Sequence, residues 1–187
     1  EIELGLVGSE MCIRDRSNGI YDTNRERVTS MSTFTDIKAK QTGGRTKQWW
    51  RNKLRTALNT YVSPQVGRMV FFDYPNPKFK EKMFHWDAFP LVYIMNEDAE
   101  HFWGANLHYV MPQERVAMGE ALAAGNSISS DVFALTVHKY LRNRVRGALL
   151  DIPESDWADI GLMPLEQFYV TINGRDKPMP TQLALKR

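Results

Sequence analysis

The chain has 187 residues, of which 43% are hydrophobic and 25% are charged. This composition is ordinary for one globular domain with a core, and it excludes a chain that is disordered throughout. The sequence has no apolar run of about 18 residues and no basic start followed by an apolar stretch, so we expect neither a membrane-spanning helix nor a secretory signal. The net charge of +2, from 24 Lys and Arg against 22 Asp and Glu, identifies no partner until it is divided along the chain.

The first thirty residues differ in character from the rest. Residues 6–17 resemble a translated sequencing adapter, and residues 18–30 are polar without apolar periodicity. We therefore expect residues 1–30 to be an artefact and an untranslated leader, disordered, with the protein's own start at Met31. Starting there leaves 20 basic and 16 acidic residues, a net charge of +4, and removes Cys12, the only cysteine, together with any disulfide or cysteine zinc site. The alternative is a genuine disordered N-terminal arm.

Three parts are expected after Met31. Residues 31–45 are polar, include two adjacent glycines and predict a flexible arm. A single α+β domain is expected over residues 46–175, followed by a loose tail over residues 176–187 that contains two prolines. The basic residues of the arm are Lys38, Lys40 and Arg45.

Apolar residues at helical spacing predict an amphipathic helix over residues 46–61 that ends before a Ser-Pro pair. At 100° per residue, three basic side chains form a row beside the apolar stripe. The row consists of Lys47, Arg51 and Arg55. Trp49 points away from the apolar face, which makes it the best candidate for a ring that stacks on another molecule.

Three strands are predicted next, over residues 67–74, 89–95 and 101–110, because these segments are rich in Val, Phe and Tyr and are bounded by turn residues. Residues 77–88 are expected to form a long exposed loop, whose lysines are most simply explained as solvated side chains. Three such closely spaced strands favour an α+β fold with a small curved antiparallel sheet of the SH3-like type, packed with about three helices.

Two further helices and one strand complete the expected elements. Pro112 at a helix start and a stop at Gly125 predict the second helix. A serine cap at residue 129 or 130 and apolar residues on one face predict a third helix that runs to about Leu150. A last strand is expected over residues 167–172. Three cations at spacings of three and four residues would share one face of the third helix: Lys139, Arg142 and Arg146.

Titratable residues leave a metal or acid–base site open as an alternative. The candidates are His85, Asp87, His101, His108 and His138. None has the spacing of a known metal motif. His101 and His108 are seven residues apart and would face opposite sides of a strand, so His108 is better explained as a buried, hydrogen-bonded residue. A carboxylate pair of Asp73 and Asp87 would suit a nuclease. We expect no catalytic residue, cofactor or metal.

Aromatic-rich blocks in a fixed order carry a family resemblance. The blocks are RTKQWWRNKLR (45–55), GRMVFFDY (67–74), HWDAFPLV (85–92), FWGANLHYVMP (102–112), HKYLRNRVR (138–146) and residues 153–168. Together they resemble the DNA end protector proteins of contractile-tailed, T4-like phages. The segment 122–129 is shorter than the pattern of that family, which puts any function of this loop in doubt.

The resemblance implies a non-enzymatic virion protein that joins the filled phage head, binds the ends of packaged double-stranded DNA and shields them from host exonuclease after injection into the host cytoplasm. Its partners would be DNA ends and head or portal components, without a membrane. A protein that holds any sequence must bind phosphates, which we assign to the arm residues and the two basic rows, with Trp49 stacking on the DNA end. The alternatives are a structural head-completion or head-to-tail joining protein and, third, a small nuclease.

Overall fold

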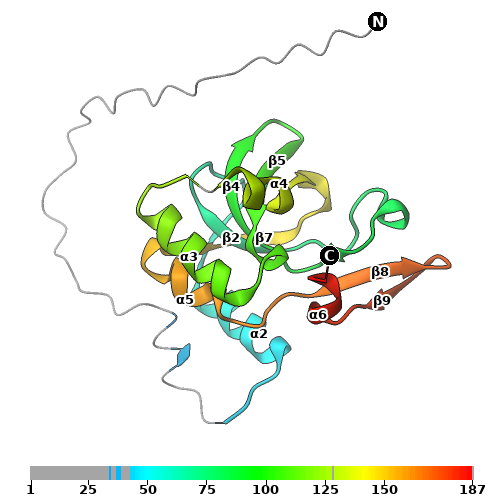
Figure 1. The fold of residues 1–187 in the computed structure, drawn as a ribbon, viewed down its shortest axis with the longest axis horizontal. Helices are drawn as coiled ribbons and strands as arrows, with labels where there is room; N and C mark the ends of the chain where they lie inside the picture. Colours follow the sequence, from blue (N-terminus) through cyan, green and yellow to red (C-terminus); the bar gives the residue numbers. More distant parts are fainter. Residues whose placement is uncertain (1–33, 35–36, 39–42, 128, 187) are drawn as a thin grey trace, which may run out of the picture. The chain divides into compact units, whose positions relative to one another are not determined.

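The fold is described from a computed structural model of the 187-residue chain (Figure 1). The structure describes residue 34, residues 37–38, residues 43–127 and residues 129–186. The expected artefact and leader at residues 1–30, and most of the arm including Lys40, lie outside the described residues. Within the arm, Phe34 is buried against Trp50, and its backbone N–H donates to a carboxylate oxygen of Asp156 at 3.3 Å. This part of the arm is therefore packed on the core.

An antiparallel sheet of six strands forms the centre of the described chain. Its strands lie in the order β1 (Asn59–Tyr61), β7 (Arg146–Ile152), β2 (Met69–Asp73), β4 (Leu91–Glu97), β5 (His101–Asn106) and β6 (Val137–Leu141). Strands β4 and β5 form a hairpin in which Gly104 lies so close to β4 that a Cβ atom there would overlap a Val92 methyl group and the Tyr93 carbonyl oxygen. The strands predicted over 67–74 and 89–95 are confirmed as β2 and β4. The strand predicted over 101–110 is confirmed as β5 as far as Asn106, and Leu107–Tyr109 form the short helix η2 instead.

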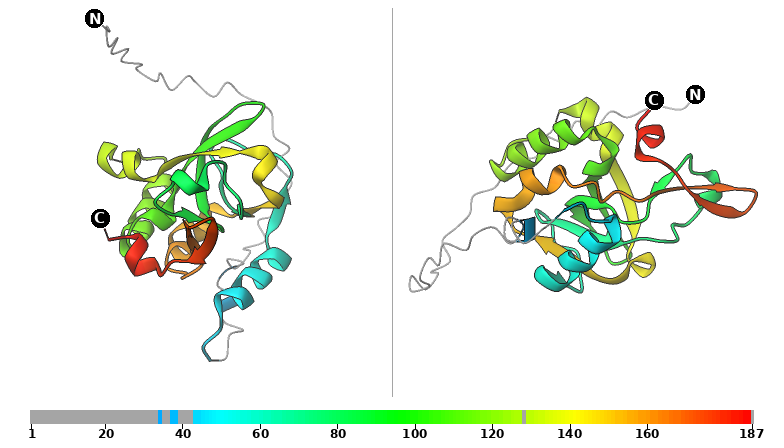
Figure 2. Two further views of the ribbon diagram at one scale, coloured as in Figure 1. Left: turned by 90° about the vertical axis from the view of Figure 1, so that its right-hand side faces the viewer. Right: turned by 90° about the horizontal axis from the view of Figure 1, so that it is seen from below.

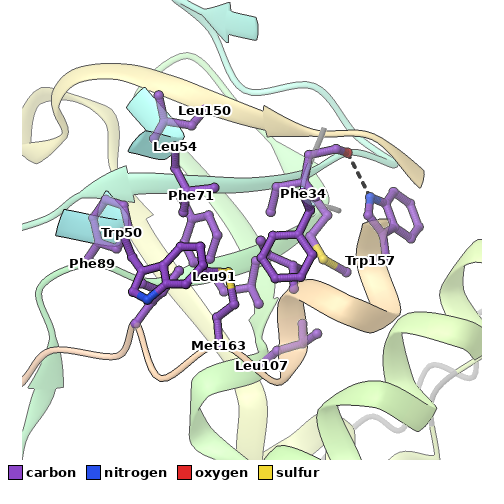
Figure 3. Close-up of a cluster of buried hydrophobic side chains, with 14 of the residues drawn as sticks. Phe34, Trp50, Leu54, Phe71, Phe89, Leu91, Leu107, Leu150, Trp157 and Met163 are labelled. Carbon is purple, nitrogen blue, oxygen red and sulfur yellow. Dashed lines mark hydrogen bonds between the residues drawn. The ribbon is translucent and has the colours of Figure 1, made fainter. Parts of the chain in front are cut away.

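Strand β2 is buried on both of its faces, because alternate side chains enter two different clusters. Met69 and Phe71 join the larger cluster, which contains residues of the helices, whereas Val70 and Phe72 join a smaller aromatic cluster with residues of β5 and β6. Figure 3 shows part of the larger cluster, with Trp50, Leu54 and Trp157 around Phe71 and Leu91. Burial on both faces explains why the first four residues of β2, from Met69 to Phe72, are all apolar.

Helix α2 (Lys47–Ala57) begins at Thr46, whose side chain caps it by accepting from Trp49 N–H at 3.2 Å. The predicted helix start is confirmed. The predicted end at residue 61 is wrong, because Asn59–Tyr61 leaves the helix to pair with β7 as strand β1. Trp50 and Leu54 face the core as the apolar spacing predicted.

Helices α3 (Pro112–Ala123) and α5 (Trp157–Gly161) lie side by side and cover the larger cluster (Figures 1 and 2). The predicted second helix is confirmed as α3, with its proline in the first turn. The predicted third helix is wrong beyond its first two turns. Helix α4 (Ser130–Thr136) is followed directly by β6 and then by β7.

Cross-strand pairing explains why this third segment leaves the helical state. Residues 137–141 pair with all five positions of β5 from His101 to Ala105, and β7 is inserted between β1 and β2. Gly147 has φ of +76°, a left-handed conformation that no α-helix contains. The apolar period of four residues fitted a helix, but the sheet required these residues as strands.

A second sheet joins the strand predicted over residues 167–172, confirmed as β8, with two segments that the sequence predicted to be irregular. It contains β3 (Trp86–Asp87), β8 (Phe168–Ile172) and β9 (Arg175–Pro178) in that order. The expected long loop over 77–88 therefore ends in a buried strand and also contains the short helix η1 (Lys80–Lys82). The expected loose tail is corrected to β9 and helix α6 (Thr181–Ala184). The Asn173-Gly174 turn, with both residues at positive φ, forms the β8–β9 hairpin seen in Figure 1.

The α+β class is confirmed, with five helices and two antiparallel sheets in the described part of the chain. The six-stranded sheet ends at β1 on one edge and at β6 on the other, and these described edge strands do not close it into a barrel. An SH3-like relationship stays a prediction.

Candidate nucleic-acid interface

Two of the three cations in the basic row of α2, Lys47 and Arg51, face the protein. Lys47 Nζ donates to the backbone carbonyl of Glu166 at 3.0 Å and lies 3.8 Å from its carboxylate. Arg51 is only 7% exposed and donates to the side-chain oxygen of Gln167. Burial lowers the pKa of Arg51, with the nearby charge of Arg55 acting in the same direction. The helical spacing placed these cations on one face as predicted, but Lys47 and Arg51 pack on the segment that leads into β8. Arg55 is exposed and pairs with Asp73 at the end of β2.

Arg55 and Arg146, predicted on two different helices, line one hollow of about 220 Å³. Arg55 Nη2 lies 2.8 Å from both carboxylate oxygens of Asp73. Arg146 begins β7 opposite Asp73 and is exposed. The pairing of β2 with β7 therefore brings Arg55 and Arg146 together. Asp73, which forms the ion pair with Arg55, is the strand partner of Arg146.

The expected basic face of a third helix does not exist, because its residues lie on three separate elements. Lys139 lies on β6 with its Nζ atom 4.9 Å from the ring centre of Trp103, its partner on β5. Arg142 lies in the short helix η3 (Arg142–Arg144) and pairs with Glu97. Arg146 follows on β7. Because these residues are not in one helix, their spacing of three and four residues does not place them on a common face.

An aromatic-lined cleft of about 300 Å³ opens where the end of β2, the 77–86 segment, residue 109 and β6 meet. We call it the aromatic cleft. Its rings and cations include Tyr74, Phe79, Trp86, Tyr109, His138 and Tyr140, with the exposed Lys78 and Lys139. The buried rings of Tyr74 and Tyr140 meet edge to face at 5.2 Å, and Tyr109 packs 4.2 Å from His138. These ring contacts hold the Tyr74–Tyr140 and Tyr109–His138 parts of the wall in place.

A second depression of about 390 Å³ adjoins the aromatic cleft, because Lys78 and Leu141 line both. We call it the basic hollow. Arg142, Asn143 and Arg144 line it as well, with Glu100 as its carboxylate. Arg144 and Lys78 are exposed. The sequence analysis selected neither residue. Lys78 was interpreted as a solvated loop lysine, and Arg144 did not lie on the expected helix face. The signal that could have indicated Lys78 is the alternation of lysines with Phe79.

The remaining predicted DNA-binding residues lie at the start of the described chain. Lys38 and Arg45 are exposed. Trp49 is half-buried, with its ring edge to face on Trp50 at 4.9 Å and two cations, Arg45 and Lys53, within 5.8 Å of its centre. Its outward direction was predicted, yet part of its surface packs against the core.

The acidic residues proposed for a nuclease have separate partners. Asp87 Oδ2 lies 2.5 Å from Nδ1 of His108, and both side chains are 1% exposed. Asp87 Oδ1 accepts from two backbone N–H groups, of Phe89 and Gln167. Burial raises the pKa of Asp87, but the charge and hydrogen bond of His108 and the two N–H donors outweigh it and hold the pKa below its ordinary value. His108 is buried and hydrogen-bonded, as its sequence context favoured.

A second buried ion pair lies beside this one. The guanidinium of Arg115 is 1% exposed and donates to the carbonyls of Val110 at 2.9 Å and His108 at 3.2 Å. Its Nη1 atom lies 3.4 Å from the Glu166 carboxylate. Burial raises the pKa of Glu166, and the charges of His108, Arg115 and Lys47 together reverse the shift. These contacts tie α3 to the segment before β8, which is a structural role.

Within the residues that the structure describes, no group of three or more His, Cys, Asp or Glu side chains is arranged to hold a metal ion. None of the described helices is long and apolar enough to span a bilayer.

Comparison with protein families places this chain. The model of a family described as phage T4 terminal DNA protecting protein matches residues 13–135, more than half of the chain. This range includes α2, the strands β1 to β5 and α3. Neither the curated proteins nor the solved structures contain a match.

Proposed function

Because this chain belongs to the family of the phage T4 terminal DNA protecting protein, we propose that it binds the ends of packaged linear double-stranded DNA without reading their sequence and protects them from host exonuclease. It acts as a component of the phage particle and remains on the DNA after injection into the host cytoplasm. Membership of a DNA protecting family supports a bacteriophage protein with a non-enzymatic role.

The observation that carries this proposal, beside the family, is the position of the aromatic cleft next to the basic hollow. Exposed cations on loops and strand ends suit phosphates, which every sequence presents. The contacts are assigned to the exposed Lys38, Arg45, Lys78, Lys139, Arg144 and Arg146. Arg142 can join after exchanging Glu97 for a phosphate, whereas Lys47, Arg51 and Arg55 chiefly hold α2 against the sheets.

Exonuclease protection tests this function directly. Blunt linear duplex is incubated with the full chain and then digested with a processive duplex exonuclease that starts at ends. We expect full-length DNA to persist in proportion to occupied ends, and the affinity for linear duplex to exceed that for circular duplex of equal length. Equal affinity for the two forms, or unchanged digestion at saturating protein, would refute end binding.

A structural role in completing the head or joining it to the tail is the second candidate. It is favoured by exposed apolar side chains between β1 and β2, where Val62 is 97% and Val66 is 56% exposed. Apolar side chains on a surface suit a protein partner. Assembly of heads with the variant Val62→Asp separates the two roles, since this candidate predicts defective particles while DNA-end affinity is retained.

A further inference from the structure

We propose that the aromatic cleft receives the terminal nucleotide of one DNA strand, unstacked from the duplex, with its base against the rings and its phosphate at the basic hollow. The inference rests on the proposed end-binding function and adds to it a place and a ligand, a single unpaired nucleotide.

The size and lining of the cleft suit one base. A volume of about 300 Å³ is at the lower end of the range for small-molecule pockets, too small for the end of a duplex. Its aromatic walls offer stacking surfaces, which hold any base because every base has a π-face. A stacked base therefore gains affinity here without sequence preference.

Phe79 supplies an independent reason to expect a ligand. It is a bulky residue at φ of +62°, in the left-handed region that glycine normally occupies. Its ring is also 58% exposed, with Lys78 Nζ at 5.0 Å and Lys82 Nζ at 5.6 Å from its centre. Strained backbone of this kind is concentrated at ligand clamps. The fold therefore places an exposed aromatic ring at the cleft on a backbone conformation that glycine would adopt with less strain.

The neighbouring charges fit the phosphate of the same nucleotide. Lys78 and Leu141 line both depressions, so a chain that leaves the aromatic cleft enters the basic hollow beside Arg144. Lys139 lies on the cleft side and Arg144 on the hollow side. One apolar ligand surface followed by one anionic group is the chemistry of a nucleotide.

This arrangement explains protection at the level of the reacting group. An exonuclease must bind the last nucleotide of a strand to cleave its phosphodiester. When the terminal base lies in the cleft and its phosphate is covered by Lys78 and Arg144, the exonuclease cannot bind that nucleotide. Opening the terminal base pair costs less than opening an internal one because it stacks on one side only.

The test pairs a change in the protein with a change in the DNA. Phe79→Gly removes the ring and relieves the left-handed strain, so its urea midpoint should equal or exceed that of the parent chain. The matched control is Phe84→Ala, which removes an exposed phenylalanine (75%) that does not line the cleft. The probe is linear duplex in which the base of the terminal nucleotide is replaced by hydrogen, at the 5′ and 3′ ends in turn, with the phosphates kept.

For the parent chain and for Phe84→Ala we expect about tenfold weaker affinity when one of the two terminal bases is missing. For Phe79→Gly we expect the weak affinity on both DNAs, with no further loss on removal of the base. A preference for linear over circular DNA that is unaffected both by base removal and by Phe79→Gly would overturn the cleft proposal while leaving end binding intact. Equal affinity for linear and circular DNA would instead refute the proposed function, and the cleft with it.

Discussion

Replacing Arg115 by Met tests whether the buried ion pairs stabilise the fold that holds the interface. Methionine follows the path of the arginine stem, so the change removes mainly the guanidinium. That group serves two backbone carbonyls and the Glu166 carboxylate, which is itself 5% exposed. Removing one partner of a buried pair typically costs about 3–5 kcal/mol because the other charge loses compensation. Glu166 keeps the partly exposed Lys47 at 3.8 Å, so we expect a loss toward the lower end of this range.

Such a loss is a large share of the roughly 5–15 kcal/mol by which a domain is stable. For a domain of this size it corresponds to a melting temperature lower by roughly 6–20 °C. Urea unfolding followed by tryptophan fluorescence measures it, because Trp50 and Trp157 are buried in the larger cluster. The exposed Arg144→Met is the matched control and should stay within about 0.5 kcal/mol of the parent chain.

A double-mutant cycle separates the ion pair from the packing of the side chain. Glu166→Gln in the Arg115→Met background removes the carboxylate charge that has lost its buried partner, so the double variant should be more stable than the two single losses added together predict. A loss of less than about 1 kcal/mol for Arg115→Met, or strict additivity of the two changes, would show that this pair does not stabilise the fold.

Three further outcomes are expected. The pKa of Asp87 is lower in the folded chain than its ordinary value. Its contribution to stability is therefore present at pH values above that ordinary value and is lost as the pH falls through the folded pKa. The urea concentration at the unfolding midpoint should decrease when the pH is lowered below about 4, and Asp87→Asn should make this decrease smaller. Gly104→Ala should lower the unfolding free energy by several kcal/mol because its Cβ overlaps β4, whereas Gly44→Ala, with open space around it, should have little effect in the same urea titration. Arg146→Ala should reduce the slope of log affinity for DNA against log salt by about one, while Lys80→Ala, which removes a lysine already paired with an aspartate, should leave the slope unchanged.

Local chemistry made part of this protein readable from its sequence. Apolar residues at helical spacing located α2, and Pro112 at a helix start located α3, because these signals depend on residues that are close in the sequence. The rows of Val, Phe and Tyr located β2 and β4. The order of the aromatic blocks indicated the family that the match over residues 13–135 confirms.

The tertiary structure decided what these elements face and where ambiguous segments go. Residues 137–150 carry an apolar period that fits a helix, yet pairing with β5, β1 and β2 makes residues 137–141 and 146–150 strands. Lys47, Arg51 and Arg55 share a face by geometry, but only the packing of α2 shows that Glu166 and Gln167 accept from that face.

The aromatic cleft could not be read from the sequence at all, because its walls come from segments as far apart as Tyr74, Tyr109 and Tyr140. Periodicity reports the burial of a side chain within its own element. Contacts between distant elements depend on the register of the strands, which the whole sheet sets together. The sequence alone therefore determined the kinds of residues available for binding DNA, and the fold determined which of them meet.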